Sequence, residues 1–320
     1  MKKHLFVLLF TCKLLFSYTD QDLEELWSSI TDIKNPTLIE YKLIENYFKT
    51  SRPYLDNLRQ RALINPGYNP RLNLILNFKL LGPHNEMPLF EKHSFNIKQH
   101  SKNRCILLFA SFNGIYQDKA RKLLAQLEKR GYSGHVLLRI GGFPNTENGD
   151  LTLSHIPYAF KLAFLREAKS LGYKEVLWLD TAIHPLTNLE TIFQEIKKTG
   201  YFFTSVGSLQ DNAENHLPEA AVALNLNTNL YPQIPHISSG ILGLNMASPK
   251  AHALLDTWYE ETIKVYPNVS WFPEELSLST VAFRLNMKPY NWFGHFVCSE
   301  SELGELKNRP SVILYLDSKR

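Results

Sequence analysis

The hydrophobic pattern is most regular downstream of residue 103, where short apolar runs alternate with amphipathic segments. Four runs have the length and composition of buried strands: 105–110, 135–140, 175–179 and 201–206. Three segments between them carry apolar side chains at helical spacing: 118–129, 158–171 and 189–198. This alternation with short links predicts an α/β fold whose mostly parallel sheet has helices on both faces, with ligands at the carboxyl ends of the strands.

The alternation loosens after residue 207. Residues 208–235 are rich in Asn, Leu and Pro and predict a loop over a site. Residues 237–245 then predict a strand that is entered through small polar side chains, and residues 249–266 predict a helix. A last helix is predicted over 274–285, with Pro273 near its start.

The first hundred residues follow a different pattern. Lys2 and Lys3 precede a short apolar stretch, so residues 1–19 are predicted to be a signal peptide or membrane anchor. We therefore expect the protein to be exported, or associated with a membrane through its N-terminus. Residues 20–100 predict a helical N-terminal extension, packed on a main domain that spans 101–320.

Composition permits a large core and narrows the partners. Hydrophobic residues make up 44% of the chain and charged residues 21%, with a formal net charge of +4. No basic run with interleaved aromatic residues is present, so we expect no nucleic-acid partner. Three cysteines make no disulfide framework: Cys105 is predicted to be a buried thiol, with a Cys105–Cys298 bond as the alternative.

Nucleotide-binding motifs are absent from the turn after the first predicted strand. Residues 110–114 (Ala-Ser-Phe-Asn-Gly) match neither a dinucleotide fingerprint nor a P-loop. Asp180 follows the apolar run 175–179, which places a carboxylate at the rim of the sheet. Such a carboxylate suits Mg²⁺ or Mn²⁺ held against a diphosphate, and the alternative is an aspartate that caps a turn or helix.

Several elements together resemble the GT-A-fold glycosyltransferases, which use nucleotide sugars. Residues 158–168 and 172–180 look like the centre of that family, and residues 238–245 resemble its N-S-G strand. Glu274 and Glu275 lie where these enzymes often have an acidic helix start, and the segment around His295 resembles a late glycine–histidine element. The family's Asp-x-Asp signature appears here as Asp180-Thr181-Ala182, which lacks the second carboxylate.

The resemblance implies a GT-A-like fold and transfer of a hexose from a nucleotide sugar to a glycan or other hydroxyl acceptor. It implies Asp180 and His295 as ligands of Mn²⁺ or Mg²⁺ and catalytic roles for Asp180, Glu274 and Glu275. Glu274 or Glu275 would act as a general base or orient the acceptor hydroxyl. Contacts to the nucleotide sugar are expected from four further side chains: Asn113, Lys161, Arg166 and Ser239.

Other interpretations stay open for these residues. The missing second aspartate also fits a catalytically inactive homologue that binds a sugar or nucleotide. Lys161 and Arg166 would otherwise lie on a solvated helix face, and Glu274 and Glu275 would provide favourable charge in a first helical turn. A secreted hydrolase would need a pair of catalytic carboxylates, which no spacing in the sequence identifies.

Overall fold

The computed structural model describes most of the chain downstream of residue 88. The described residues are 19, 21–22, 25, 89–97, 102–111, 114–141, 153, 158–216, 218–264, 273–290, 296–297 and 314–316. The predicted signal peptide or anchor lies outside them except for Thr19, and so does most of the predicted helical extension.

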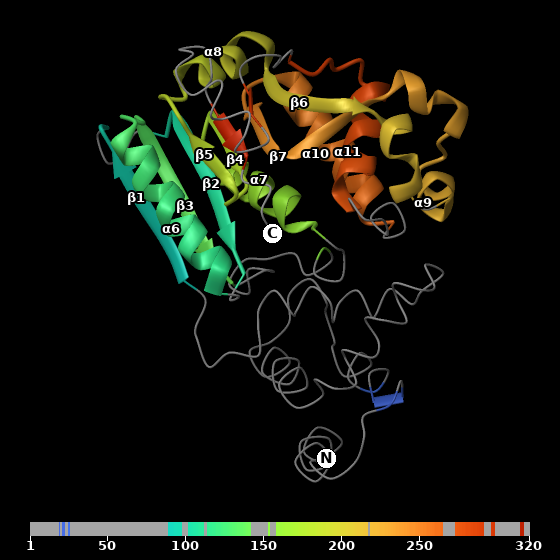
Figure 1. Cartoon of the computed structure of the whole chain (residues 1–320), viewed down its shortest axis with the longest axis horizontal. Helices are drawn as coiled ribbons and strands as arrows, with labels where there is room; N and C mark the ends of the chain where they lie inside the picture. Colours follow the sequence, from blue (N-terminus) through green and yellow to red (C-terminus); the bar gives the residue numbers. More distant parts are fainter. Residues whose placement is uncertain are drawn as a thin grey trace.

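A six-stranded sheet forms the centre of the part of the chain that the structure describes (Figure 1). Its strands are β1 (Leu89–Phe95), β2 (Arg104–Ala110), β3 (Gly134–Ile140), β4 (Glu175–Leu179), β6 (Tyr201–Ser208) and β7 (Pro235–Asn245), in the spatial order β1-β3-β2-β4-β7-β6. Strand β2 pairs in parallel with β3 and β4, whereas β1 and β7 run antiparallel to their neighbours. Strands β2, β3, β4 and β6 therefore share one direction.

Helices cover both faces of this sheet. They are α6 (Gly114–Lys129), α7 (Phe160–Ser170), α8 (Glu190–Thr199), α10 (Pro249–Thr262) and α11 (Pro273–Arg284). Because side chains alternate along a strand, Leu107 packs with the core of α7, α10 and α11, while the adjacent Leu108 packs with that of α6 and α8. The chain thus has a mixed α/β fold with a central sheet and flanking helices, as the alternating pattern predicted.

Strand β1 extends the sheet upstream of the expected domain start at residue 101. It falls inside the 20–100 range that we predicted to be helical, yet it pairs with β3 over Leu89–Phe95. Its side chains alternate between half-buried and exposed positions, as expected for an edge strand. The pattern in this range is too polar to reveal a strand before its pairing partner is known.

Residues 208–235 are short helices rather than the predicted loop. They form η3 (Leu209–Asn215), α9 (Pro218–Ala223) and η4 (Thr228–Gln233). Asn227 caps η4 through its side chain, and Ser208 and Asp211 make a capping box at η3. A small core that includes Leu209, Tyr231 and Leu276 holds them against α11, so the polar residues that suggested a loop serve instead as helix caps.

Strands β5 (Ile183–Pro185), β9 (Leu314–Leu316) and β8 (Phe296–Val297) form a second, small sheet. Cys105 is a free, buried thiol as predicted, and burial raises its pKa.

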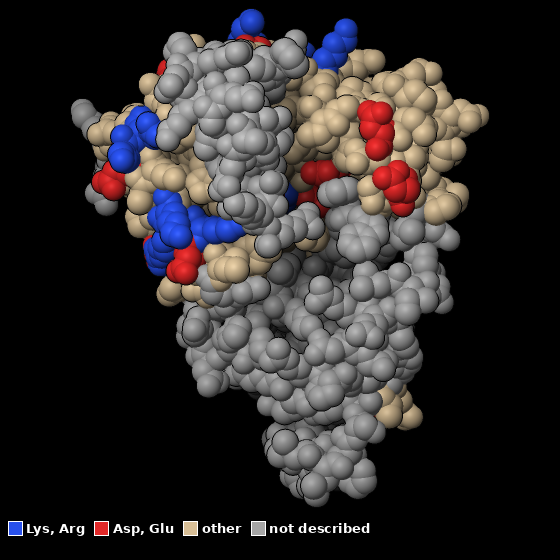
Figure 2. Space-filling view, viewed as in Figure 1, with Lys and Arg blue, Asp and Glu red and all other residues tan. Residues whose placement is uncertain are grey.

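Among the described helices, none is long and apolar enough to cross a membrane. On the face drawn in Figure 2, described Lys and Arg side chains form small groups, several with Asp or Glu beside them.

Candidate functional site

The candidate site lies where β4 ends. Asp180 directly follows β4, and its backbone N–H donates to the carbonyl oxygen of Gly240 at 2.9 Å. Because β7 runs antiparallel to β4, the residues that precede Ile241 in β7 extend past the last residue of β4. Strand β7 therefore brings Ser239 and Gly240 beside Asp180, although about sixty residues separate them along the chain.

Helix α7 contributes a buried ammonium group. Lys161 lies in its first turn, with a side chain only 3% exposed, and its Nζ lies 2.7 Å from Glu274 Oε1 and 3.2 Å from Asp180 Oδ2. The same Nζ donates to Ser239 Oγ at 2.8 Å. Burial lowers the pKa of Lys161, but the facing carboxylates outweigh burial and raise it overall. Lys161 is therefore a permanent cation at the centre of the cluster.

Helix α11 contributes two carboxyl groups with different environments. Glu274 is buried beside Lys161 and 2.5 Å from Ser239 Oγ, and burial raises its pKa. Burial also acts to raise the pKa of Glu275, but hydrogen bonds from His236 Nε2 at 2.9 Å and from the Ser239 N–H at 2.9 Å lower it overall. Glu275 therefore carries a fixed negative charge, and Glu274 is the carboxyl that keeps a proton more readily.

Asp180 is the carboxylate of the cluster most open to a ligand. Its side chain is 37% exposed, against 5% for Glu274 and 14% for Glu275. Asp180 Oδ1 accepts a hydrogen bond from Trp178 Nε1 at 2.8 Å, and Lys161 holds Oδ2. Each carboxylate oxygen still has lone-pair capacity for a ligand, so Asp180 is an oriented acceptor at the surface.

An exposed aromatic side chain lies at the rim of the site. Tyr158 is 48% exposed, and the Lys161 ammonium lies 5.9 Å from the centre of its ring. Its backbone has φ of 59°, in the left-handed region that bulky residues rarely adopt. A strained conformation that presents an aromatic ring at the rim of a polar cluster suits stacking against a sugar or base.

The structure brings together most of the residues that the sequence singled out. Five of them form one contact network: Lys161, Asp180, Ser239, Glu274 and Glu275. Arg166 lies elsewhere on α7, pairs with Asp256 at 3.4 Å and stacks on Tyr259. Asn113 and His295 lie outside the described residues.

Two members of the network were missed by the sequence analysis. Trp178 and Asp180 are two apart in an extended segment, so strand alternation already placed their side chains on one side. His236 gave no comparable signal, because it precedes the predicted strand and meets Glu275 only through tertiary packing.

The side chains of the candidate site limit how a metal ion could be bound. Within the part of the chain that the structure describes, no group of three or more His, Cys, Asp or Glu residues is placed to hold one. Asp180 offers exposed oxygen, and Mg²⁺ commonly takes one or two protein carboxylates and completes its shell with phosphate oxygens and water. The described residues thus fit a shared ion, completed by a substrate, rather than a cage made by the protein.

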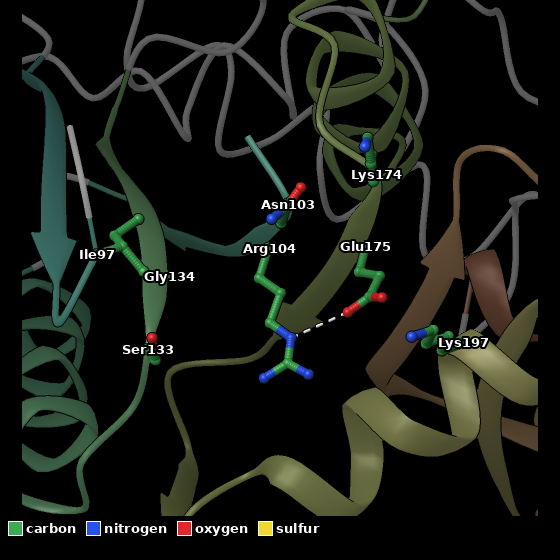
Figure 3. A pocket seen from close by; sticks show the side chains of 8 residues that line it. All are labelled: Ile97, Asn103, Arg104, Ser133, Gly134, Lys174, Glu175 and Lys197. Atoms are coloured by element: carbon green, nitrogen blue, oxygen red, sulfur yellow. Dashed lines mark hydrogen bonds and ion pairs between the residues drawn. The ribbon is translucent and has the colours of Figure 1, made fainter. Parts of the chain in front are cut away.

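A cavity of about 490 Å³ lies at the opposite ends of the strands from Asp180 (Figure 3). It is lined at the amino ends of β2, β3 and β4, where Arg104 pairs with Glu175 at 3.0 Å. Arg104 also pairs with Glu190, so its guanidinium is already neutralised. We take Asp180 rather than this cavity as the candidate site, because substrates of open α/β sheets bind at the carboxyl ends of the strands.

The chain is similar to solved structures of other proteins, but the two sequence comparisons found no match. No protein-family model matches the chain, and no curated protein matches it. The galactosyltransferase LgtC, solved with donor and acceptor sugar analogues, is similar over 67% of this chain and 87% of its own, with 10% identity and a TM-score of 0.41. Mouse xyloside xylosyltransferase 1 is similar over 68% of this chain and 97% of its own, with 11% identity and a TM-score of 0.41.

A third solved structure gives a similar result. A glycosyltransferase involved in glycosylation of the major capsid of PBCV-1 is similar over 68% of this chain and 94% of its own, with 10% identity and a TM-score of 0.40. At such identities and scores the likeness carries no argument, so the function of this chain has to be inferred from its own side chains.

Proposed function

We propose that this protein is a glycosyltransferase that moves a hexose from a nucleotide sugar to a glycan or other hydroxyl acceptor. The observation that carries the proposal is the convergence of Lys161, Asp180, Ser239, Glu274 and Glu275 at the carboxyl end of β4. Among the three carboxylates of this cluster, Asp180 alone is well exposed, while the buried groups fix its position. Such a group accepts hydrogen bonds from the hydroxyls of a bound sugar or ribose.

The charge of the cluster defines how a diphosphate is accommodated. One ammonium faces three carboxyl groups, so the cluster is net negative even when Glu274 keeps its proton. A diphosphate beside Asp180 therefore needs an added cation. In the proposal Asp180 would hold Mn²⁺ or Mg²⁺, together with His295, which lies outside the described residues. When bound, the ion offsets the negative charge that develops on a departing nucleotide.

The protein's own groups supply orientation in this proposal. Trp178 and Lys161 each hold one oxygen of Asp180, which keeps its free lone pairs directed outward. The buried Glu274 and Glu275 hold Lys161 and Ser239 in place, and one of the two is proposed to act on the acceptor side. Tyr158 provides a ring face at the rim for stacking against the sugar or base.

Ligand binding and turnover test the proposal directly. Purified protein is titrated with UDP-, GDP- and CMP-sugars, with and without Mn²⁺, by thermal shift and calorimetry, and nucleotide release is then followed with the donor that binds. Ligand that binds only the folded state must raise the melting temperature. Asp180→Asn, which keeps the shape and removes the charge, is expected to abolish binding or release.

The chain offers a matched control for that variant. Asp256→Asn makes the same chemical change at a side chain that is 59% exposed and pairs only with Arg166 among the ion pairs of the described residues. It is expected to behave as wild type. Failure of every nucleotide sugar to bind, or wild-type turnover in Asp180→Asn, would overturn the proposal.

A second candidate function is a sugar- or nucleotide-binding homologue without turnover. Two observations favour it: Ala182 replaces the second carboxylate of Asp-x-Asp, and the side chains of Glu274 and Glu275 are engaged inside the cluster. Binding of a nucleotide sugar without release of its nucleotide, in the presence of acceptors, is the result that distinguishes this function from transfer.

A further inference from the structure

A buried hydrogen-bonded chain leads from η3 to the candidate site. Asn212 Nδ2 lies 2.9 Å from His236 Nδ1, and His236 Nε2 lies 2.9 Å from Glu275 Oε2. His236 is only 1% exposed, and both contacts are at least partly buried. Because η3 belongs to the short-helix segment at residues 208–235, these hydrogen bonds connect that segment to α11 and β7.

The partners of His236 specify its tautomer. The Asn212 amide nitrogen is a donor, so His236 Nδ1 accepts and carries no proton. The single imidazole proton is therefore on Nε2, directed at the Glu275 carboxylate. In this tautomer His236 donates a charge-assisted hydrogen bond from Nε2 to the carboxylate of Glu275.

Glu275 links the hydrogen bond from His236 to the residues of the candidate site. Its other oxygen, Oε1, accepts from the Ser239 N–H at 2.9 Å and lies 3.0 Å from Ser239 Oγ. Ser239 Oγ in turn accepts from Lys161, which holds Asp180. Every link is a hydrogen bond or ion pair between groups with fixed geometry, so a displaced Glu275 moves Ser239 and weakens the hold on Lys161.

We propose that His236, held in one tautomer by Asn212, is a positioning residue that orients Glu275 and, through Ser239 and Lys161, the exposed Asp180. The assignment rests on the proposed function, since it states what fixes the site that binds the nucleotide sugar. His236 reaches a ligand only through these other residues. Its removal therefore changes the geometry of the site without removing a group that touches substrate.

Two substitutions at His236 separate its hydrogen bond from its bulk. His236→Phe keeps a ring of similar size and cannot donate, whereas His236→Gln places an amide donor near the position of Nε2. We expect His236→Phe to lower kcat/KM for the nucleotide sugar by about tenfold or more, and His236→Gln to recover most of that loss. Equal losses in two folded variants, or wild-type kinetics in His236→Phe, would overturn the assignment.

A neighbouring histidine provides the control. His216 is also buried, and its ring centre lies 5.5 Å from that of His236. Neither of its ring nitrogens has a hydrogen-bond partner among the described residues. His216→Phe makes the same substitution without removing a hydrogen bond, so its kinetics are expected to match wild type. A loss at His216→Phe equal to that at His236→Phe would show that ring packing, rather than the hydrogen bond, is responsible.

Nitrogen NMR of the imidazole rings tests the assignment independently of activity. A neutral Nε2–H form of His236 that becomes doubly protonated or mixed in Asn212→Leu supports it. A charged ring or an Nδ1–H form in the wild type overturns it. If no nucleotide sugar binds the wild type, the proposed function fails, and this spectrum still decides how His236 is held.

Discussion

At the scale of single residues, one buried cation determines how the candidate site is built. Lys161 lies within 3.2 Å of two carboxylates and a serine hydroxyl, and its side chain is nearly inaccessible to solvent. Burying an ammonium group is costly unless such partners compensate it. The lysine and its carboxylates therefore depend on one another, and only Asp180 among them also has substantial contact with solvent.

Replacing Lys161 by methionine is expected to destabilise the protein. Lys161→Met keeps the aliphatic length but leaves the buried Glu274 beside Asp180 without its cation, which we expect to cost about 3 kcal/mol at neutral pH. Urea denaturation measures the loss. Adding Glu274→Gln removes one of the uncompensated charges and should restore part of the stability; strictly additive losses in the double variant would contradict the coupling.

His216 makes stability depend on pH. Burial is the main cause that lowers the pKa of His216 from 6.5 to about 4, so the folded protein resists protonation that the unfolded chain accepts. The contribution of neutral His216 to the free energy of unfolding is therefore complete above pH 6.5. It falls by about 2 to 3 kcal/mol between pH 6.5 and about 4. The titratable groups around it, His236, Glu275 and Glu214, contribute smaller and partly opposing effects.

Denaturation across that range measures the contribution of His216. His216→Phe cannot take up the proton, so its stability is expected to fall less steeply than that of wild type as the pH is lowered. Parallel curves for the two proteins would show that His216 does not account for the pH dependence.

At the scale of elements, an ion pair attaches the edge strand β1 to the helix beside it. Both carboxylate oxygens of Glu91 on β1 are bound by the guanidinium of Arg121 on α6. The hydrogen bond from Arg121 is the main cause that lowers the pKa of Glu91 from 4.5 to about 2. The contribution of the ionised Glu91 is thus complete above pH 4.5 and is lost as the pH falls through about 2.

This ion pair is partly solvated, so its contribution is modest. Arg121 is 43% exposed, and we expect Glu91→Gln to cost about 1 kcal/mol above pH 4.5. The difference from wild type should shrink as the pH is lowered toward 2. Amide hydrogen exchange in β1 localises the effect, and a difference that stays constant with pH would contradict it.

The elements also show how much of the fold the sequence predicted. The strands at β2, β3 and β4 and the helices α7, α8 and α11 lie within a few residues of their predicted ranges, because each has a clear apolar period. Strand β1 was missed because an edge strand with one covered face has little apolar signal. Residues 208–235 were assigned to a loop because residues that cap short helices also occur in loops.

At the scale of the whole molecule, β1 defines where the sheet begins. It pairs with β3 along seven residues and covers an edge that would otherwise present unpaired backbone groups. A chain that starts at residue 101, our predicted boundary, is therefore expected to be less stable and more prone to aggregate than one that also contains β1. Denaturation and light scattering compare the two; equal stability and solubility would show that β1 is dispensable.

The sequence by itself determined the local periods, and with them the α/β architecture and the residues worth testing at strand and helix ends. Asp180 was identified because it directly follows the apolar run 175–179, which predicts the end of a buried strand. Only the tertiary structure decided that Lys161, Asp180, Ser239, Glu274 and Glu275 meet, that Arg166 does not, and that His236 joins them. The physical reason is that antiparallel pairing of β7 with β4, and the packing of α11 against β7, set contacts between residues far apart in the chain.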